Sequence, residues 1–400
     1  MKRSGHADLP LHYGHVPLWL AERMSKLGGA IIESIAIEYG RGEVLSRLSD
    51  PAWFQSLGCV LGMDWHSSGI TTSVMGALKR SVNKQSKELG IYICGGKGRF
   101  SRNTPDELLK FSDITGLNGD LLVRNSRLTA KVDNTAIQDG FQIYLHCFVV
   151  SVDGQWTVIQ QGMNGASGYA RRYHWHSENV KSFIEDPHTF IYGRNQGTIL
   201  NLVDKGAKLT QQAILDLSKQ DPAKIITETR KILLPAHHEV RASDVNIKRL
   251  GATLALAHEK DLVNFEDLLL LEGVGPRTLQ SLTLVSEVIH GTPSRFNDPA
   301  RFSFAHGGKD GHPFPVPLKT YDESISVLEN SIRKAKIGEP DKHKALQNLH
   351  KASVLLEENF VAKDNLEALI EKERKESYKY GGRTVFGKSV PPSPEQLKLF

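Results

Sequence analysis

The chain has 400 residues, enough for two or three domains, and its 40% of hydrophobic residues exclude wholesale disorder. A formal net charge of +5 permits an anionic partner where the cations cluster. Three widely spaced cysteines (Cys59, Cys94 and Cys147) exclude a disulfide scaffold and a cysteine-rich zinc finger. No run reaches the ~18 apolar residues of a membrane span, and no apolar segment follows the basic start, so we expect a cytoplasmic protein without membrane contact.

Residues 1–205 have the mixed pattern of an α+β domain, which we expect to be the catalytic part. A helix is expected from Leu18, directly after Pro17, to Ile32. The clearest strand pair is Phe141–Val152 and Gln155–Gln160, because an Asp153-Gly154 turn joins the two apolar runs. Shorter strand-like runs are Cys59–Met63 and Ile91–Cys94. We therefore predict a mixed α/β domain with an antiparallel hairpin.

The apolar pattern becomes helical after residue 205. We expect a helical domain at 206–320, a pair of charged helices at 321–380, and a flexible tail at 381–400, where glycine and proline accumulate. The candidate helices are Leu209–Leu217, Ala223–Leu233, Ile247–Glu259 and Phe265–Leu271, followed by the charged pair Tyr321–Lys336 and Lys342–Ser377.

The segment Gly273-Val274-Gly275 resembles the turn of a DNA-binding helix-hairpin-helix motif, with apolar helices on both sides. Glycines let backbone amides approach a phosphate, and the start of the next helix adds a partial positive charge. The expected DNA-binding residues are Gly273, Val274, Gly275, Pro276, Arg277 and Thr278. The alternative is an ordinary turn between two helices with a glycine cap.

The last five residues, Gln396-Leu397-Lys398-Leu399-Phe400, resemble the peptide by which bacterial proteins bind the sliding clamp. Gln396 would enter a polar pocket, while Leu397, Leu399 and Phe400 would supply the apolar contacts. The proline-rich residues before them prevent a helix and keep the peptide extended. The alternative is a tail that docks on its own protein.

Polar residues beside the apolar runs are the candidates for catalysis. Asp64 and His66 follow one strand-like run, and Asp139 precedes the hairpin strand that carries His146. We expect Asp64 and Asp139 to hold Mg²⁺ or Mn²⁺, because a metal-dependent nuclease needs converging carboxylates, and His66, His146 or His174 to assist. In the structural alternatives, Asp64 caps a helix that starts near Ser67 and His146 is a hydrogen-bonded core residue.

Further cations are candidates for binding DNA. Arg171, Arg172 and His174 alternate with aromatic residues, as in a groove for nucleic acid, although a solvated face is the alternative. Gln142, Tyr144 and His146 are expected on one face of their strand. Lys97 and Lys309 lie in glycine-rich loops that are suited to phosphate but lack Walker spacing.

Asp298 offers a different chemistry. Base-excision glycosylases that carry the hairpin motif have a catalytic aspartate roughly twenty residues after it, and Asp298 lies a few residues beyond that offset. The alternative is a turn at Asp298-Pro299.

Four segments resemble an uncharacterised archaeal and bacterial family, domain of unknown function 763. They are Lys2–His12, Leu61–Gly69, Gln138–Gly140 and Ser303–Gly311. The resemblance covers nearly the whole chain, but it implies no reaction.

Together these features favour a metal-dependent DNA nuclease, or a related DNA-processing enzyme of repair or replication, that is associated with the nucleoid and recruited to the sliding clamp. The alternatives are a non-catalytic adaptor between DNA and the clamp, and a base-excision glycosylase that uses Asp298. A homo-oligomer is compatible with either.

Overall fold

The computed structural model describes residues 9–11, 16–64, 67–231, 247–260, 262–292, 294–300, 318–358, 383–384 and 387–388. Contacts divide the chain into one unit from Met1 to Ser353 and a second from Val354 to Phe400. The described part of the second unit comprises the end of α14 (Glu339–Glu358) and the antiparallel pair β7 (Arg383–Thr384) and β8 (Gly387–Lys388). This pair lies within the segment predicted to be a flexible tail.

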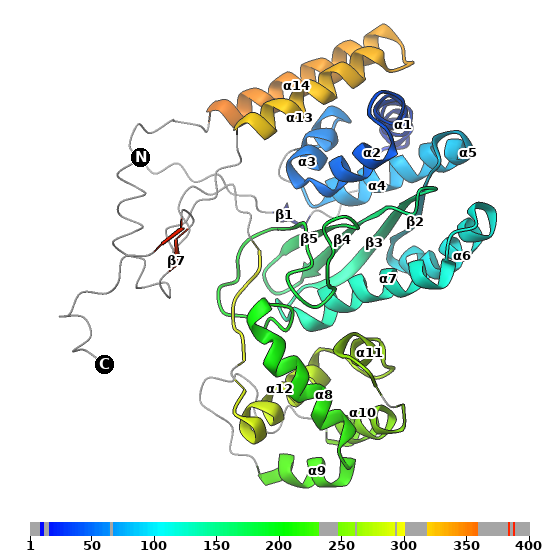
Figure 1. The fold of residues 1–400 in the computed structure, drawn as a ribbon. Coiled ribbons are helices and arrows are strands. Elements are labelled where there is room, and N and C mark those ends of the chain that lie inside the picture. The colour runs from blue at the N-terminus through cyan, green and yellow to red at the C-terminus, as the bar shows by residue number, and fades with distance from the viewer. Residues whose placement is uncertain are drawn as a thin grey trace, which may run out of the picture. The chain divides into compact units, whose positions relative to one another are not determined.

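The described strands of the first unit form an antiparallel sheet in the order β1-β5-β4-β3-β2, and β6 also pairs with β5 (Figure 1). Their bounds are β1 Leu9–Pro10, β2 Ile91–Lys97, β3 Gln142–Ser151, β4 Trp156–Asn164, β5 Tyr169–His176 and β6 Phe190–Tyr192. The predicted hairpin is confirmed as β3 and β4. Gly154 occupies its turn with φ +81°, a conformation that glycine adopts without strain.

Helices cover both faces of this sheet (Figure 1). Alternate β3 residues face opposite ways: Cys147 and Val149 belong to the core under α1–α4, and Phe148 and Val150 to the core on the α6–α7 side. The first layer is α1 (Leu18–Tyr39), α2 (Arg41–Ser49), α3 (Pro51–Val60) and α4 (Gly69–Val82); the second is α6 (Thr104–Thr115) and α7 (Gly119–Lys131). Shorter turns are η1 (Asn83–Gln85), α5 (Ser86–Leu89), η2 (Gly98–Asn103), the π-helical η3 (Val132–Ala136) and η4 (Lys205–Ala207).

Two glycines allow α1 and α4 to approach closely. A Cβ at Gly28 would lie 2.9 Å from Leu78 Cδ2, and a Cβ at Gly29 would lie 2.6 Å from Ser81 Cβ. Any larger residue would push these helices apart, because close-packed interiors have no spare volume.

The strand predicted at Cys59–Met63 is wrong, because Cys59 and Val60 end helix α3. Asp50 caps this helix by accepting hydrogen bonds from the amides of Ala52 (2.7 Å) and Trp53 (3.1 Å), and Pro51 occupies its first position. All residues of α3 are buried, so its sequence lacks the polar face that normally reveals a helix.

The expected alternation along β3 is also wrong at Tyr144. The register with β4 shifts between Ile143 and Leu145, so Tyr144 is an inserted residue. Tyr144 packs against the α1–α4 core, whereas His146 bonds to Ser126 of α7 on the opposite face. A bulge therefore separates two side chains that were expected on one face.

The helices predicted in the middle of the chain are confirmed as α8 (Lys208–Lys219), α9 (Pro222–Lys231), α10 (Ile247–Glu259), α11 (Phe265–Leu270) and α12 (Pro276–His290). Their apolar residues share one continuous core with α7 and the sheet. After α12 the chain returns to residues 200–201, where Phe296 forms a bridge with Leu200 and Asn201 N donates to Arg295 O (2.9 Å).

The described part of the charged helical pair consists of α13 (Leu318–Lys334) and α14. The rest of the predicted second helix, residues 359–377, lies outside the described residues. Leu328 and Ile332 of α13 are buried in the α1–α4 core, together with Ala345 and Leu349 of α14. Ion pairs from Lys334 to Glu38 (2.6 Å) and from Lys336 to Glu33 (3.0 Å) link the pair to α1.

Candidate nucleic-acid interface

The turn between α11 and α12, Leu271–Gly275, brings two glycines and a helix start together. Gly273 has φ +82°, and Gly275 is the extended N-cap of α12. Val274 between them is 3% exposed and belongs to the core, whereas Arg277 is exposed. The first amides of a helix have no acceptor within it, so this turn combines backbone donors with an exposed cation.

Three side chains hold the α11–α12 turn in place. Lys131 Nζ donates to Val274 O (2.7 Å), and Gln138 Nε2 donates to Pro276 O (2.9 Å). Thr278, expected to contact DNA, is buried, and its hydroxyl donates to Gly273 O (3.3 Å). It therefore supports the turn from inside, and the turn is tied to α7 and to the residues that precede β3.

A second basic surface follows β2. We call residues Lys97–Arg102 the basic loop. Lys97, Arg99, Phe100 and Arg102 are exposed. The Arg99 guanidinium lies 5.2 Å from the centre of the Phe100 ring, and Lys97 Nζ lies 5.9 Å from that of Tyr144. Sequence reasoning identified Lys97 but missed Arg99 and Phe100, although the alternation of cation and aromatic was visible in the sequence.

The basic loop and the α11–α12 turn lie toward the same end of the sheet, where β3 begins. Lys97 pairs with Leu145 near the start of β3, and Gln138, which contacts Pro276, lies just before that strand. Gly95 has φ +86°, and a Cβ there would lie 2.2 Å from His146 O, so glycine is required where β2 leads into the loop.

Polar side chains run inward from the basic loop. Tyr144 accepts a hydrogen bond from Gln161 Nε2, and Thr71 donates to Gln161 Oε1. Gln161 Nε2 also donates to Ser68 O (2.9 Å), next to the start of α4. Arg172 Nη1 in turn donates to Thr71 Oγ1 (3.3 Å). This series of contacts connects Lys97 at the surface to the buried guanidinium of Arg172.

Arg172 is fully buried, so it does not line an exposed groove as expected. Its guanidinium donates to Gln55 Oε1 (2.9 Å) and to His174 Nε2 (2.9 Å), and it stacks on Phe54 and Tyr192. Burial without a carboxylate partner among the described residues lowers the pKa of Arg172 to about 10. His174 is also buried, and burial and the adjacent Arg172 hold its pKa well below the ordinary value.

Arg171 is buried on the other face of β5 and joins two candidate catalytic residues. It donates to Asp139 Oδ2 (2.8 Å) and forms a two-point ion pair with Asp298 (2.5 and 3.0 Å). Tyr173 also donates to Asp139 (2.6 Å), and the amide of Ala300 donates to Asp298 (2.9 Å). Burial opposes the charge of Arg171, but the two carboxylates outweigh it and raise its pKa. Neither carboxylate side chain is exposed to solvent.

His146 is a hydrogen-bonded core residue, as its structural alternative stated. Its Nε2 lies 2.8 Å from Ser126 Oγ, and its Nδ1 lies 2.8 Å from Gln160 Oε1. Burial lowers its pKa to about 4, so the ring is neutral near pH 7. Sequence reasoning missed Asp133, which accepts hydrogen bonds in the interior from Gln160, the partner of His146, and from Trp175 (3.0 Å) and His188.

Asp64 is exposed in the loop between α3 and α4. It does not cap α4, whose N-cap is Ser68. Asp139 is held instead in the interior by Arg171 and Tyr173, and the described residues contain no group of three or more His, Cys, Asp or Glu that could hold a metal ion. His66, Lys309, Gln396, Leu397, Leu399 and Phe400 lie outside the residues that the structure describes.

Residues 5–316 match the family described as "Protein of unknown function (DUF763)", and the chain therefore belongs to this family. The resemblance seen in the sequence is thus confirmed. No curated protein and no solved structure matches the chain. Within its described part, the chain has no helix that is both long and apolar enough to span a bilayer.

Proposed function

We propose that this protein binds DNA through the phosphate backbone, and that the α11–α12 turn is its main contact. The observation that carries this proposal is the pairing of Gly273, at positive φ, with an N-terminal helix end beside exposed Arg277. Backbone amides and a helix N-terminus suit an anion, and they read no sequence. This arrangement supports a helix-hairpin-helix role over an ordinary glycine-capped turn.

The basic loop supplies a second contact. Lys97, Arg99 and Arg102 offer three cations, and half-exposed Phe100 offers a ring on which a base can stack. Because both surfaces lie toward the end of the sheet where β3 begins, one nucleic-acid segment can contact both.

The test is fluorescence anisotropy with a labelled duplex of arbitrary sequence, titrated at several salt concentrations. Arg277→Glu should weaken binding to all sequences alike and reduce the slope of log K against log salt by about one. Glu272 is exposed within the turn and would repel a phosphate, so Glu272→Gln should tighten binding. Unchanged affinity in both variants would remove the α11–α12 turn from the interface.

We further propose Mg²⁺- or Mn²⁺-dependent cleavage of the bound DNA, with Asp64 as a metal ligand. An exposed carboxylate close in sequence to the start of α4 supports this role. Because the described residues hold no group of three or more possible ligands, at least one ligand of such a group would come from outside them, and His66 is the candidate closest in the sequence. End-labelled single-stranded, duplex and forked DNA, incubated with each metal or with EDTA, tests it. Asp64→Asn should abolish cleavage and leave binding intact, whereas binding without cleavage in every lane would favour the adaptor.

Recruitment to the sliding clamp through Gln396–Phe400 belongs to the same proposal, and it rests on the sequence of the peptide alone. A clamp pull-down with the full chain, compared with a chain lacking these residues, tests it. Equal capture of both chains would show that these five residues are not the clamp-binding segment.

A further inference from the structure

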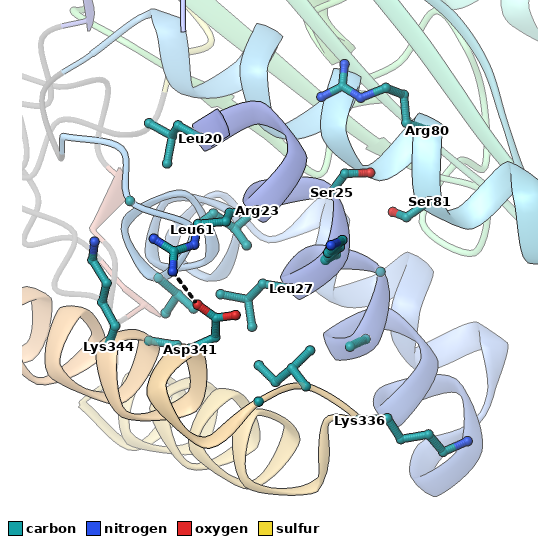
Figure 2. A pocket seen from close by; sticks show the side chains of 18 of the residues that line it. Leu20, Arg23, Ser25, Leu27, Leu61, Arg80, Ser81, Lys336, Asp341 and Lys344 are labelled. Carbon is teal, nitrogen blue, oxygen red and sulfur yellow. Dashed lines mark ion pairs between the residues drawn. The ribbon is translucent and has the colours of Figure 1, made fainter. Parts of the chain in front are cut away.

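A pocket of about 670 Å³ lies on the α1 side of the molecule, within the first unit. Its walls come from α1, the end of α3, the end of α4 with η1, and the α13–α14 turn with the start of α14 (Figure 2). Its volume falls within the range of small-molecule binding sites. None of its lining residues belongs to the basic loop or to the α11–α12 turn.

The lining is strongly cationic. Six cationic and two acidic side chains contribute to it. Both carboxylates are already paired: Asp341 lies 3.0 Å from Arg23, and Glu33 lies 3.0 Å from Lys336. The cations without a carboxylate partner among the described residues are Lys26, Arg80, Lys84 and Lys344. The uncompensated positive charge favours an anionic ligand.

The rest of the lining is apolar, with a few polar groups. Leu20, Leu27 and Leu61 turn side chains toward the pocket (Figure 2), and Trp19, 56% exposed, belongs to its lining. The hydroxyls of Ser25 and Ser81 both donate to Ala77 O, which leaves their oxygens able to accept a hydrogen bond. A ligand that fills this pocket therefore combines an anionic group with a largely apolar body that carries a few hydrogen-bond donors.

We propose that this pocket binds a nucleoside phosphate. Its phosphates would pair with the four cations that have no carboxylate partner among the described residues, and its base would lie on the leucines and Trp19. Inorganic phosphate would leave the apolar surface unused, and an acyl chain would offer no donor to the serine oxygens. The nucleoside phosphate can be a free nucleotide or the phosphorylated end of a single strand.

Isothermal titration of the full chain separates these cases. The ligands are AMP, ATP, adenosine, inorganic phosphate and a hexanucleotide with or without a 5′-phosphate. The nucleotides should bind roughly tenfold or more tightly than either adenosine or inorganic phosphate. If the free nucleotide is the ligand, ATP binds and the phosphorylated hexanucleotide does not compete with it. If the strand end is the ligand, the 5′-phosphate strengthens binding of the hexanucleotide, and ATP competes with the hexanucleotide.

Charge reversal identifies the site. The double variant Arg80→Glu/Lys84→Glu should lower the affinity for the nucleotide roughly tenfold or more, and Arg80→Gln/Lys84→Gln should lower it less. Lys110→Glu, which reverses an exposed cation on α6 outside the pocket, is a control and should bind as the wild type does. Arg277→Glu should retain nucleotide binding, which distinguishes this pocket from the DNA contact. Equal affinity for inorganic phosphate and nucleotide, or wild-type affinity in a folded double variant, would overturn the proposal.

Discussion

Replacement of Arg171 tests whether Asp139 and Asp298 are structural carboxylates. The three side chains connect β5, the segment before β3 and the segment after α12, and none of them is more than 1% exposed. Arg171→Met leaves two carboxylates buried close to each other without a cation. Each keeps a backbone hydrogen bond, from Phe141 or from Ala300, but their charges are no longer compensated.

The expected losses of unfolding free energy differ among the three positions. Breaking a buried ion pair by removing one partner costs about 3–5 kcal/mol. Arg171→Met should reach the upper end of this range because it leaves two buried carboxylates without a cation. Asp139→Asn should cost less, about 1–3 kcal/mol, because Arg171 keeps its two-point pair with Asp298. Adding Asp139→Asn and Asp298→Asn to Arg171→Met should restore part of the loss, since no unpaired charge then remains.

Urea unfolding at pH 7, followed by tryptophan fluorescence, measures these differences. A loss below about 1 kcal/mol for Arg171→Met, or a smaller loss than for Asp139→Asn, would refute the structural role derived from the ion pairs. Unfolding with and without Mn²⁺ adds a functional control. If Mn²⁺ stabilised the wild type and Asp139→Asn abolished this effect, Asp139 would be a metal ligand after all.

Three further predictions follow from the interior. The pKa of His146 is about 4 in the folded chain, below its ordinary value, so the unfolded chain binds more protons between these values and the wild type loses stability as the pH falls. Its advantage over His146→Gln should shrink by about 1.4 kcal/mol per pH unit between pH 6 and 4.5, and a constant difference in urea unfolding would contradict this. Gly29→Ala should lower the free energy of unfolding by about 1–2 kcal/mol despite the better helix propensity of alanine, because the new Cβ would meet Ser81. An unchanged melting curve would refute the close approach of α1 and α4. Burial raises the pKa values of Cys59 and Cys147 to about 12, and Asp64 also raises that of Cys59. Iodoacetamide at pH 8 should therefore label neither thiol until the chain unfolds, and mass spectrometry can check this.

Local signals in the sequence were sufficient for much of the fold. The Asp153-Gly154 turn predicted the β3–β4 hairpin, and the helical period predicted α8, α10 and α11 to within two residues at each end. It also predicted the start of α9 to within one residue, whereas the predicted end at Leu233 lies outside the described residues. The same reasoning placed a turn between α11 and α12, and α11 ends at Leu270, one residue before the predicted Leu271. It failed at α3, because a helix that is buried on all sides has no polar face.

The candidate site was less predictable, because partners of charged residues are distant in sequence. Arg171 and Asp298 are 127 residues apart, and nothing near either one indicates that they pair. The same residue types that resemble a nucleic-acid groove in the sequence are buried in the structure, at Arg171 and Arg172. Lys97 was predicted correctly as a surface residue, since a glycine-rich loop is a local feature.

The sequence by itself determined the elements whose signals lie within one turn or one helix, including the glycines at the start of α12, because backbone preference and periodicity act over a few residues. The tertiary structure alone decided which carboxylates pair with Arg171 and on which face of β3 Tyr144 lies after the bulge. It also decided where α1, α4 and α14 enclose a cationic pocket. These features depend on long-range packing, in which burial and charge pairing are set by elements that the chain brings together only on folding.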